Sequence, residues 1–148
     1  MNRGYDVKLE INGNGTEEIP LFVNFDDFFI ANLFTVEIHD SEPFLNLKLR
    51  DFGNLRFFDS KNITIQNSQF NELTFVSCEN IIAKVLNAEY IRVENCKNLT
   101  LLNVNVSYVH VIAGFNINIA NSTIQKLVRE RNEDLKIETS LIERTKLT

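Results

Sequence analysis

Two consecutive stretches, CENIIAKVLNAEYIRVEN (Cys78–Asn95) and CKNLTLLNVNVSYVHVIA (Cys96–Ala113), align without a gap over eighteen residues. Each begins with Cys, has Asn at its third position and then alternates apolar with polar residues. The same step of eighteen residues continues in both directions along the chain. It places Asn, or its closest relative Asp, at Asn62, Asn80, Asn98, Asn116 and Asp134. A period shared by so many units is the signature of an internal repeat.

Further columns of equivalent residues follow the same step. Three are apolar: Phe52, Phe70, Ala88, Val106, Ile124, Ile142; Leu55, Leu73, Ile91, Val109, Leu127; and Phe57, Phe75, Val93, Val111, Leu147. The second apolar column is broken at Thr145, and the third is interrupted by Arg129. A fourth column is uniformly small or short: Ser60, Cys78, Cys96, Gly114, Asn132. Agreement across these columns is far more specific than any short motif.

The repeat predicts the architecture. Pairs such as Ile63/Ile65 and Leu73/Phe75 alternate with polar neighbours, which is the period of a strand with one buried face. Eighteen residues are too few for a helical crossover between parallel strands, but they suit one coil of a β-solenoid. We therefore predict an all-β, single-stranded parallel β-helix with about 18 residues per coil and a right-handed turn. It spans residues 32–148 in about six coils, behind an N-terminal cap at residues 1–31.

The Asn/Asp column has a structural role in this prediction. Asn tolerates unusual backbone angles at a turn and bonds neighbouring backbone groups. When coils stack, the amides of successive Asn residues can also pair along the axis. The small column just before it fits a tight inward corner.

Two other solenoids fit the sequence less well. The segments LTFVSCENI and YIRVENCKNL are similar to part of a leucine-rich repeat, but such units are about 20–29 residues long. The other half of each unit also has the pattern of a strand, which leaves no helix for the convex side. Left-handed hexapeptide helices need an aliphatic residue at every sixth position. The polar column Asp51, Gln69, Asn87, Asn105, Thr123 excludes that pattern.

The stretches NITIQNSQF, LTLLNV and INIANSTI resemble the right-handed β-helices of the pectin-lyase-like superfamily. The resemblance covers roughly residues 44–148, and the short coils are similar to those of bactofilins. It implies the fold. Through the lyases and galacturonases of this architecture, it also implies a carbohydrate-related activity that would need several outward acids gathered on neighbouring coils. The acids of this chain fall in scattered positions of the repeat, so we expect no catalytic residues and no enzymatic activity.

The two ends depart from the repeat. Residues 5–25 contain two apolar stretches around NGNG, which predict a hairpin or two cap strands, and FDDFFIANL predicts a short helix beginning at Asp26 or Asp27. A cap is expected because the end of a β-helix exposes its core. The C-terminal units are more charged, which protects an edge from aggregation, although an uncapped end can also serve self-association.

Composition excludes several classes of function. A net charge of −5 with no long basic run predicts no nucleic-acid partner. The start MNRGYDVKLE lacks the apolar core of a signal peptide, and no stretch approaches the ~20 apolar residues of a membrane helix. We therefore expect a cytoplasmic or otherwise intracellular protein with no membrane partner and no cofactor.

Cys78 and Cys96 raise the question of a metal site or a disulfide. Zinc needs four ligands at tetrahedral spacing, and His39 and His110 lie at unrelated positions of the repeat. Stacked Cys residues one coil apart point the same way, and the expected compartment is reducing. We predict no metal, no disulfide and two free buried thiols.

One outward surface stands out. The eighteen-residue step makes neighbours of Tyr90, Arg92, Tyr108 and His110, a combination typical of protein interfaces. An apolar rim flanks them. The predicted interaction surface consists of Phe58, Val76, Tyr90, Arg92, Tyr108, His110 and Ile112. We expect a non-enzymatic structural or scaffolding protein that forms a homo-oligomer or binds a protein partner; the alternative is a carbohydrate-binding or degenerate polysaccharide-processing β-helix.

Overall fold

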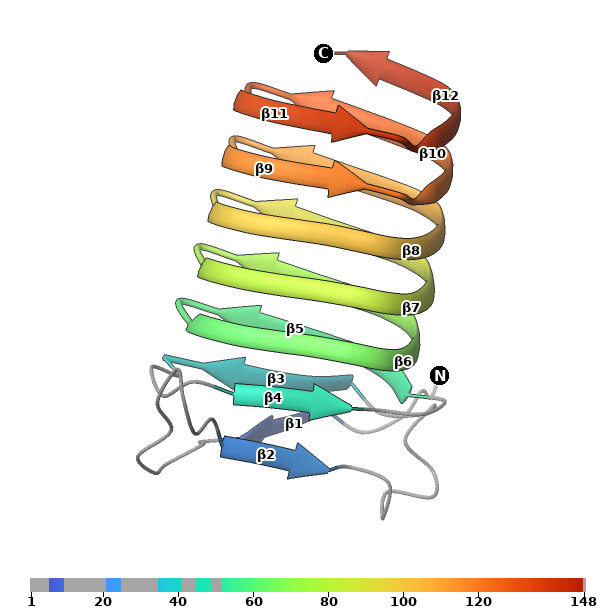
Figure 1. Ribbon diagram of the computed structural model, residues 1–148. Helices are drawn as coiled ribbons and strands as arrows, with labels where there is room; N and C mark the ends of the chain where they lie inside the picture. Colours follow the sequence, from blue (N-terminus) through green and yellow to red (C-terminus); the bar gives the residue numbers. More distant parts are fainter. Residues whose placement is uncertain (1–5, 10–20, 25–34, 41–44, 49–51, 148) are drawn as a thin grey trace.

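The strands of this protein stack into a parallel solenoid of about five turns (Figure 1). The computed structural model describes residues 6–9, 21–24, 35–40, 45–48 and 52–147, and none of these residues is helical. The strands are β1 (Asp6–Leu9), β2 (Leu21–Asn24), β3 (Thr35–His39), β4 (Leu45–Lys48), β5 (Phe52–Phe58), β6 (Lys61–Val76), β7 (Glu79–Glu94), β8 (Lys97–Ile112), β9 (Phe115–Ala120), β10 (Thr123–Glu130), β11 (Glu133–Glu138) and β12 (Leu141–Leu147). The predicted all-β parallel solenoid is confirmed.

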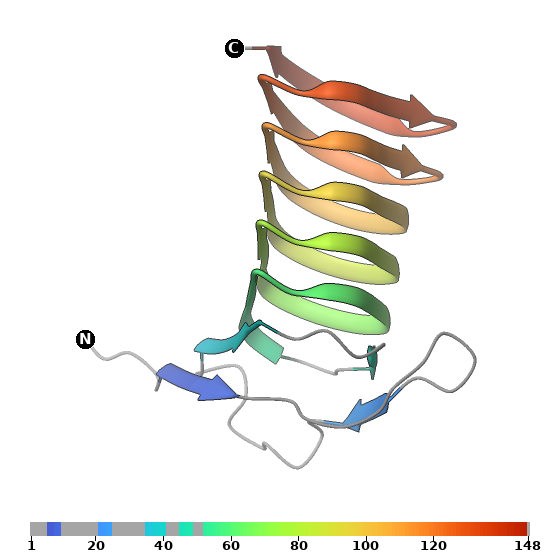
Figure 2. The ribbon, with the colours of Figure 1, turned by 90° about the vertical axis from the view of Figure 1, so that its left-hand side faces the viewer.

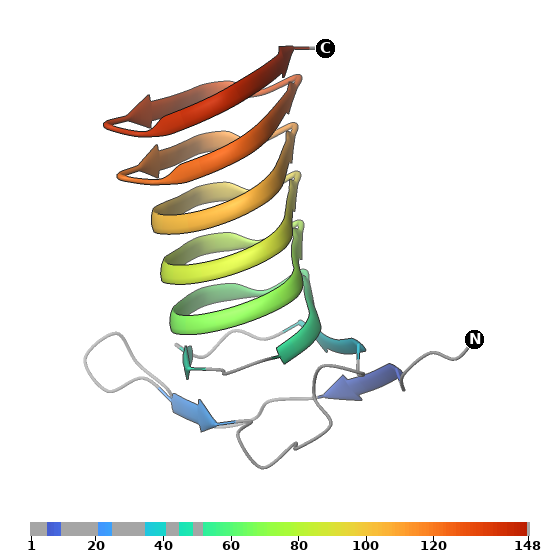
Figure 3. The same ribbon diagram turned by 90° about the vertical axis from the view of Figure 1, so that its right-hand side faces the viewer.

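Each coil is flattened into two long sides (Figures 1 to 3). The near side in Figure 1 contains β2, β4, the first halves of β6, β7 and β8, then β9 and β11; we call its outer surface face A. The far side contains β1, β3, β5, the second halves of β6, β7 and β8, then β10 and β12; its outer surface is face B. The chain crosses the near side from left to right, returns behind from right to left and rises toward the C-terminus, so the coil is right-handed.

The register follows the repeat that the sequence contains. Ile63 pairs with Ile81, and Ile81 pairs with Leu99, in each case eighteen residues further along. These columns point inward, and all three side chains are at most 1% exposed. The core is therefore a set of apolar columns running along the axis, and Phe57 and Phe75 stack within it with their ring centroids 5.3 Å apart.

The Asn column forms the predicted ladder between coils. Asn80 Nδ2 donates to Asn62 Oδ1 at 3.2 Å, Asn98 Nδ2 to Asn80 Oδ1 at 3.3 Å, and Asn116 Nδ2 to Asn98 Oδ1 at 2.7 Å. All four residues, and Asp134 at the next step, have φ between 56° and 64°. Asn therefore meets two requirements at this position: its backbone tolerates the left-handed region, and its side-chain amide both donates and accepts a hydrogen bond.

The small column lines the narrow turn between face B and face A. A Cβ added to Gly114 would lie 2.6 Å from Cγ1 of Ile117 and 3.1 Å from Oδ1 of Asn132, so a larger residue would clash. Ser60 and Cys78 instead turn their polar atoms toward carbonyl oxygens two residues earlier, at 2.9 and 3.4 Å. Close packing within the turn therefore excludes large side chains from this column.

The N-terminal strands belong to the same two stacks. β1 pairs in parallel with β3, and β2 pairs in parallel with β4, so these two strands do not pair with each other as a hairpin. The paired residues Asp6 and Thr35 are twenty-nine apart, and Leu21 and Leu45 are twenty-four apart. The eighteen-residue step therefore does not extend to this coil. The short helix expected in FDDFFIANL lies outside the described residues.

Candidate interaction surface

Face B carries the aromatic and charged residues that the repeat predicts to be neighbours. Tyr90 and Arg92 of β7 stand directly opposite Tyr108 and His110 of β8. The rings of Tyr90 and Tyr108 lie 5.3 Å apart and are tilted by 60°, and His110 meets Tyr108 edge-on at 6.3 Å. All four side chains are half-buried, so each presents part of its surface to solvent.

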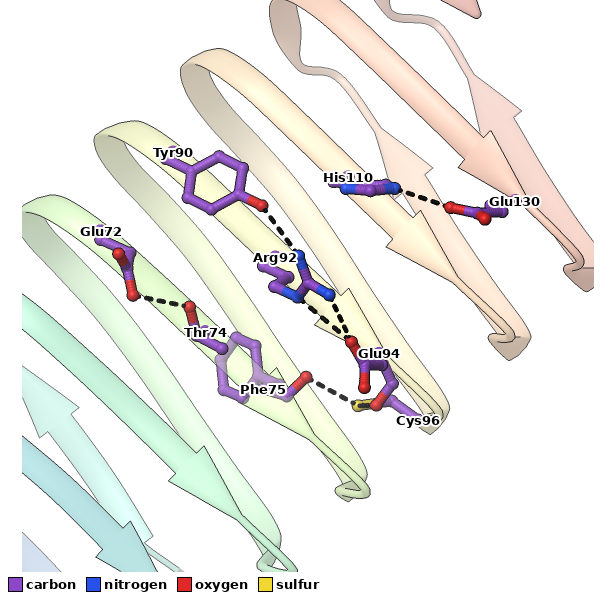
Figure 4. A network of polar contacts seen from close by, with 9 residues as sticks. All are labelled: Glu72, Thr74, Phe75, Tyr90, Arg92, Glu94, Cys96, His110 and Glu130. Atoms are coloured by element: carbon purple, nitrogen blue, oxygen red, sulfur yellow. Dashed lines mark hydrogen bonds and ion pairs between the residues drawn. The ribbon is translucent and has the colours of Figure 1, made fainter. Parts of the chain in front are cut away.

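Arg92 is fixed by its own strand (Figure 4). Its Nε and Nη2 both donate to Oε1 of Glu94, and its Nη1 donates to the hydroxyl of Tyr90 at 3.5 Å. The hydrogen bond to Glu94 raises the pKa of Arg92, and the bond to Tyr90 adds to the effect. The guanidinium is therefore held in one position on face B, with a side chain that is 36% exposed.

His110 is paired with a carboxylate from the next coil. Its Nε2 lies 3.1 Å from Oε2 of Glu130 (Figure 4). Tyr108 also makes a cation–π contact with that coil, since Nζ of Lys126 lies 5.6 Å from the centre of its ring. Lys126 was not among the predicted surface residues, although the eighteen-residue step places it in the column of Tyr90 and Tyr108.

The lower coils of face B are tied together by ion pairs. Arg56 Nε donates to Glu72 Oε2 at 2.8 Å, and the hydroxyl of Thr74 donates to the same oxygen at 3.0 Å. Below them, the ring of His39 stacks on Phe58 at 4.6 Å. Glu72 pairs with Arg56, and Glu37 lies close to both His39 and Arg56, so acids and bases are paired in this part of face B.

The apolar rim is less accessible than the sequence suggests. Phe58 and Val76 are half-buried, and Ile112 is only 7% exposed although it points outward. Rows of side chains about 4.8 Å apart shield one another when the strands are this closely spaced. Ile112 therefore adds little to the exposed part of the predicted surface, whereas the other six residues are each partly exposed.

Both Cys residues are buried at the narrow turn and are not linked to each other. Cys96 Sγ lies 3.3 Å from the carbonyl oxygen of Glu94 and 3.5 Å from that of Phe75. Within the thiol pair, the side-chain hydrogen bond lowers the pKa of Cys78 and raises that of Cys96, and burial raises the latter further. This geometry packs the turn and leaves both sulfurs out of reach of solvent.

The described residues line hollows along both edges of the solenoid. One, of about 350 Å³, follows the narrow turn beside Asp40, Asp59 and Glu79. The other, of about 230 Å³, is lined by polar side chains that include Asn87 and Asn105 at the rounded edge. Neither is lined by the Tyr90–His110 group. Across the described parts of the chain, no three His, Cys, Asp or Glu side chains are arranged to hold a metal ion.

Comparisons with protein-family models, curated proteins and solved structures gave no match. Within the described ranges, the structure contains no helix with the length and apolar character needed to cross a membrane. The function must therefore be argued from the surface itself.

Proposed function

We propose that this solenoid is a non-enzymatic scaffold that binds another protein chain through face B. The observation that carries the proposal is the contiguous group of Tyr90, Arg92, Tyr108 and His110 on a flat sheet. Tyr and Arg dominate the binding energy of protein interfaces, because they combine a large contact area with polar groups that can bond.

The sheet beneath this group makes it well suited to docking. Each of the two strands that carry it is hydrogen-bonded along its length to the coils on either side. Arg92 is already held by Glu94 and Tyr90, and His110 is held by Glu130. Side chains that are ordered before binding lose less conformational entropy when a partner arrives, which favours affinity.

The same geometry disfavours the carbohydrate alternative. Sugar rings stack on broad aromatic faces, whereas the planes of Tyr90 and Tyr108 are tilted by 60° and form no common platform. Three acids beside this group, Glu72, Glu94 and Glu130, are each paired with a basic side chain. A glycan array probed with wild type and with Tyr90→Ala tests this alternative, and Tyr90-dependent glycan binding would overturn the proposal.

The first experiment asks whether the other chain is a second copy. Sedimentation velocity is measured over a range of concentrations for wild type and for Tyr90→Ala/Tyr108→Ala. The matched control is Thr100→Ala/Asn118→Ala, an equivalent pair of opposed residues on face A. Self-association through face B predicts that only the Tyr pair shifts the distribution toward the monomer.

If wild type is a monomer throughout, a photo-crosslinking residue at position 108 identifies a different partner. Crosslinking is done in the cells that make the protein, with the same group at position 100 as the control. One defined protein crosslinked from position 108 and absent from position 100 is the expected result. Monomers together with no crosslink, or the same products from both positions, would contradict the proposal.

A further inference from the structure

The last two coils of face B carry three cations that lie close together. Lys126 stands directly opposite Arg144, and Lys146 is two residues further along the same strand as Arg144. Arg144 and Lys146 are exposed, and Lys126 is half-buried against the ring of Tyr108. We call these three residues the cationic patch.

The cationic patch differs from the rest of face B in its charge balance. Lower on this face, Arg56 is paired with Glu72, and Arg92 is paired with Glu94. Among the residues that the structure describes, no ion pair involves any member of the patch. Like charges directly opposite each other on neighbouring strands destabilise a sheet. Lys126 is stabilised by the ring of Tyr108, but among the described residues no acid lies within ion-pair distance of any of the three cations. A bound anionic group would offset the repulsion.

We propose that the cationic patch binds an acidic, extended segment of the protein partner. This inference rests on the proposed function and names the chemistry of the partner. Arg144 and Lys146 are two residues apart on one strand, so their side chains are about 6.8 Å apart at their bases. Alternate carboxylates of an extended segment have the same spacing. Such a segment lying along β12 can therefore meet both cations at once, and its carboxylate at Arg144 also lies beside Lys126, which stands opposite Arg144.

The surroundings of the patch favour a short acidic segment over a nucleic acid. Three cations are fewer than the 6–10 phosphate contacts typical of a nucleic-acid site. Below the patch, Arg92 is paired with Glu94 and His110 with Glu130, so the excess of positive charge does not continue down this part of face B. The chain as a whole has a net charge of −5, so its long-range field does not attract polyanions.

The test uses a fluorescein-labelled peptide of five Glu-Thr repeats, which places its carboxylates on one side of an extended strand. Fluorescence anisotropy is measured at low and at physiological salt, with a Gln-Thr peptide for comparison. We expect saturable binding of the acidic peptide alone, weakened by salt. Lys126→Gln/Arg144→Gln/Lys146→Gln should lower the affinity about tenfold, because three exposed charge contacts are removed.

The matched control changes the net charge equally but away from face B. Lys84→Gln/Lys97→Gln/Arg131→Gln removes three cations from face A and the narrow turn and should leave the affinity unchanged. Circular dichroism and thermal melting check that both variants are folded. Equal loss in the two variants, or no binding of the acidic peptide at low salt, would overturn the inference. Tighter patch-dependent binding of single-stranded DNA or a heparin oligosaccharide would also overturn it.

The test of the cationic patch can fail without contradicting the proposed function. A partner that is still crosslinked from position 108 after the patch is neutralised shows that face B binds protein through other contacts. In that case only the acidic character of the partner is wrong.

Discussion

The middle coils and the last coil are built from the same repeat, yet they differ in how completely their inward side chains are buried. In β7 and β8 the inward apolar residues are at most 8% exposed, whereas the equivalent Leu135, Ile137 and Ile142 are only partly buried. In the last coil Thr145 also replaces an apolar residue of an inward column, and Arg129 does so in the coil before it. A coil of a solenoid is sealed by the coils on both sides, so the same residue type contributes less stability in the last coil.

The largest expected difference comes from the same Leu→Ala substitution at two positions of one inward column. Leu99→Ala removes a side chain that is fully buried, and we expect it to lower the free energy of unfolding by about 3–4 kcal/mol. Leu135→Ala makes the same change two coils higher, and we expect about 1 kcal/mol, because the residue is already half-exposed.

Urea unfolding followed by circular dichroism measures both losses. Hydrogen exchange of the individual strands is measured as well, because a solenoid can unfold from one end and circular dichroism reports only the average over all strands. Equal losses at the two positions would show that the last coil is as well sealed as the middle ones.

The Asn ladder predicts the next largest effect. Asn98 donates to Asn80 and accepts from Asn116, at φ 57°. Asn98→Ala loses both hydrogen bonds and strains the backbone, so we expect a loss of about 2 kcal/mol. Asn98→Gly relieves the strain but not the loss of the ladder and should recover about half of it. If the Gly and Ala variants unfold alike, the backbone angle is not the reason for Asn in this column.

Much of this organisation could be predicted from the sequence, because each column repeats one local requirement in every coil. The apolar columns predict the core, and the Asn column predicts a turn that the left-handed φ angles of its residues confirm. The parallel pairing of β1 and β2 could not be found in this way, since the spacing of that coil is different.

The exposure and pairing of side chains on face B could not be predicted from the sequence either. The burial of Ile112 and the pairing of His110 with Glu130 depend on side-chain conformations in neighbouring coils. The repeat gives only the rows in which these residues lie. It therefore predicts which residues are neighbours but not which of them remain exposed.

Val85 shows where residue type and backbone disagree within the middle coils. It has φ 53° in a column that otherwise holds Asn67, Asn103, Asn121 and Thr139. A β-branched residue is strained in this region, and the Val85 side chain is 49% exposed, so it gains little from burial. Val85→Asn should therefore raise the free energy of unfolding by about 1 kcal/mol. Val85→Ala, which keeps a Cβ at the same φ, should gain less; a lower melting temperature for Val85→Asn would contradict this account.

The smallest effect is expected at the two thiols. Ser60 occupies the same column and donates to the carbonyl oxygen of Phe58 at 2.9 Å, so Ser fits the turn that Cys78 and Cys96 pack. Cys78→Ser/Cys96→Ser should change the free energy of unfolding by less than about 1 kcal/mol. In the wild type, the raised pKa of Cys96 keeps its thiol protonated at neutral pH, and burial blocks access to both sulfurs. A thiol reagent at about pH 8 should therefore react only as fast as the solenoid opens. Rapid modification of the folded protein, or a marked drop in the melting temperature of the double Ser variant, would show that the pair does more than fill the narrow turn.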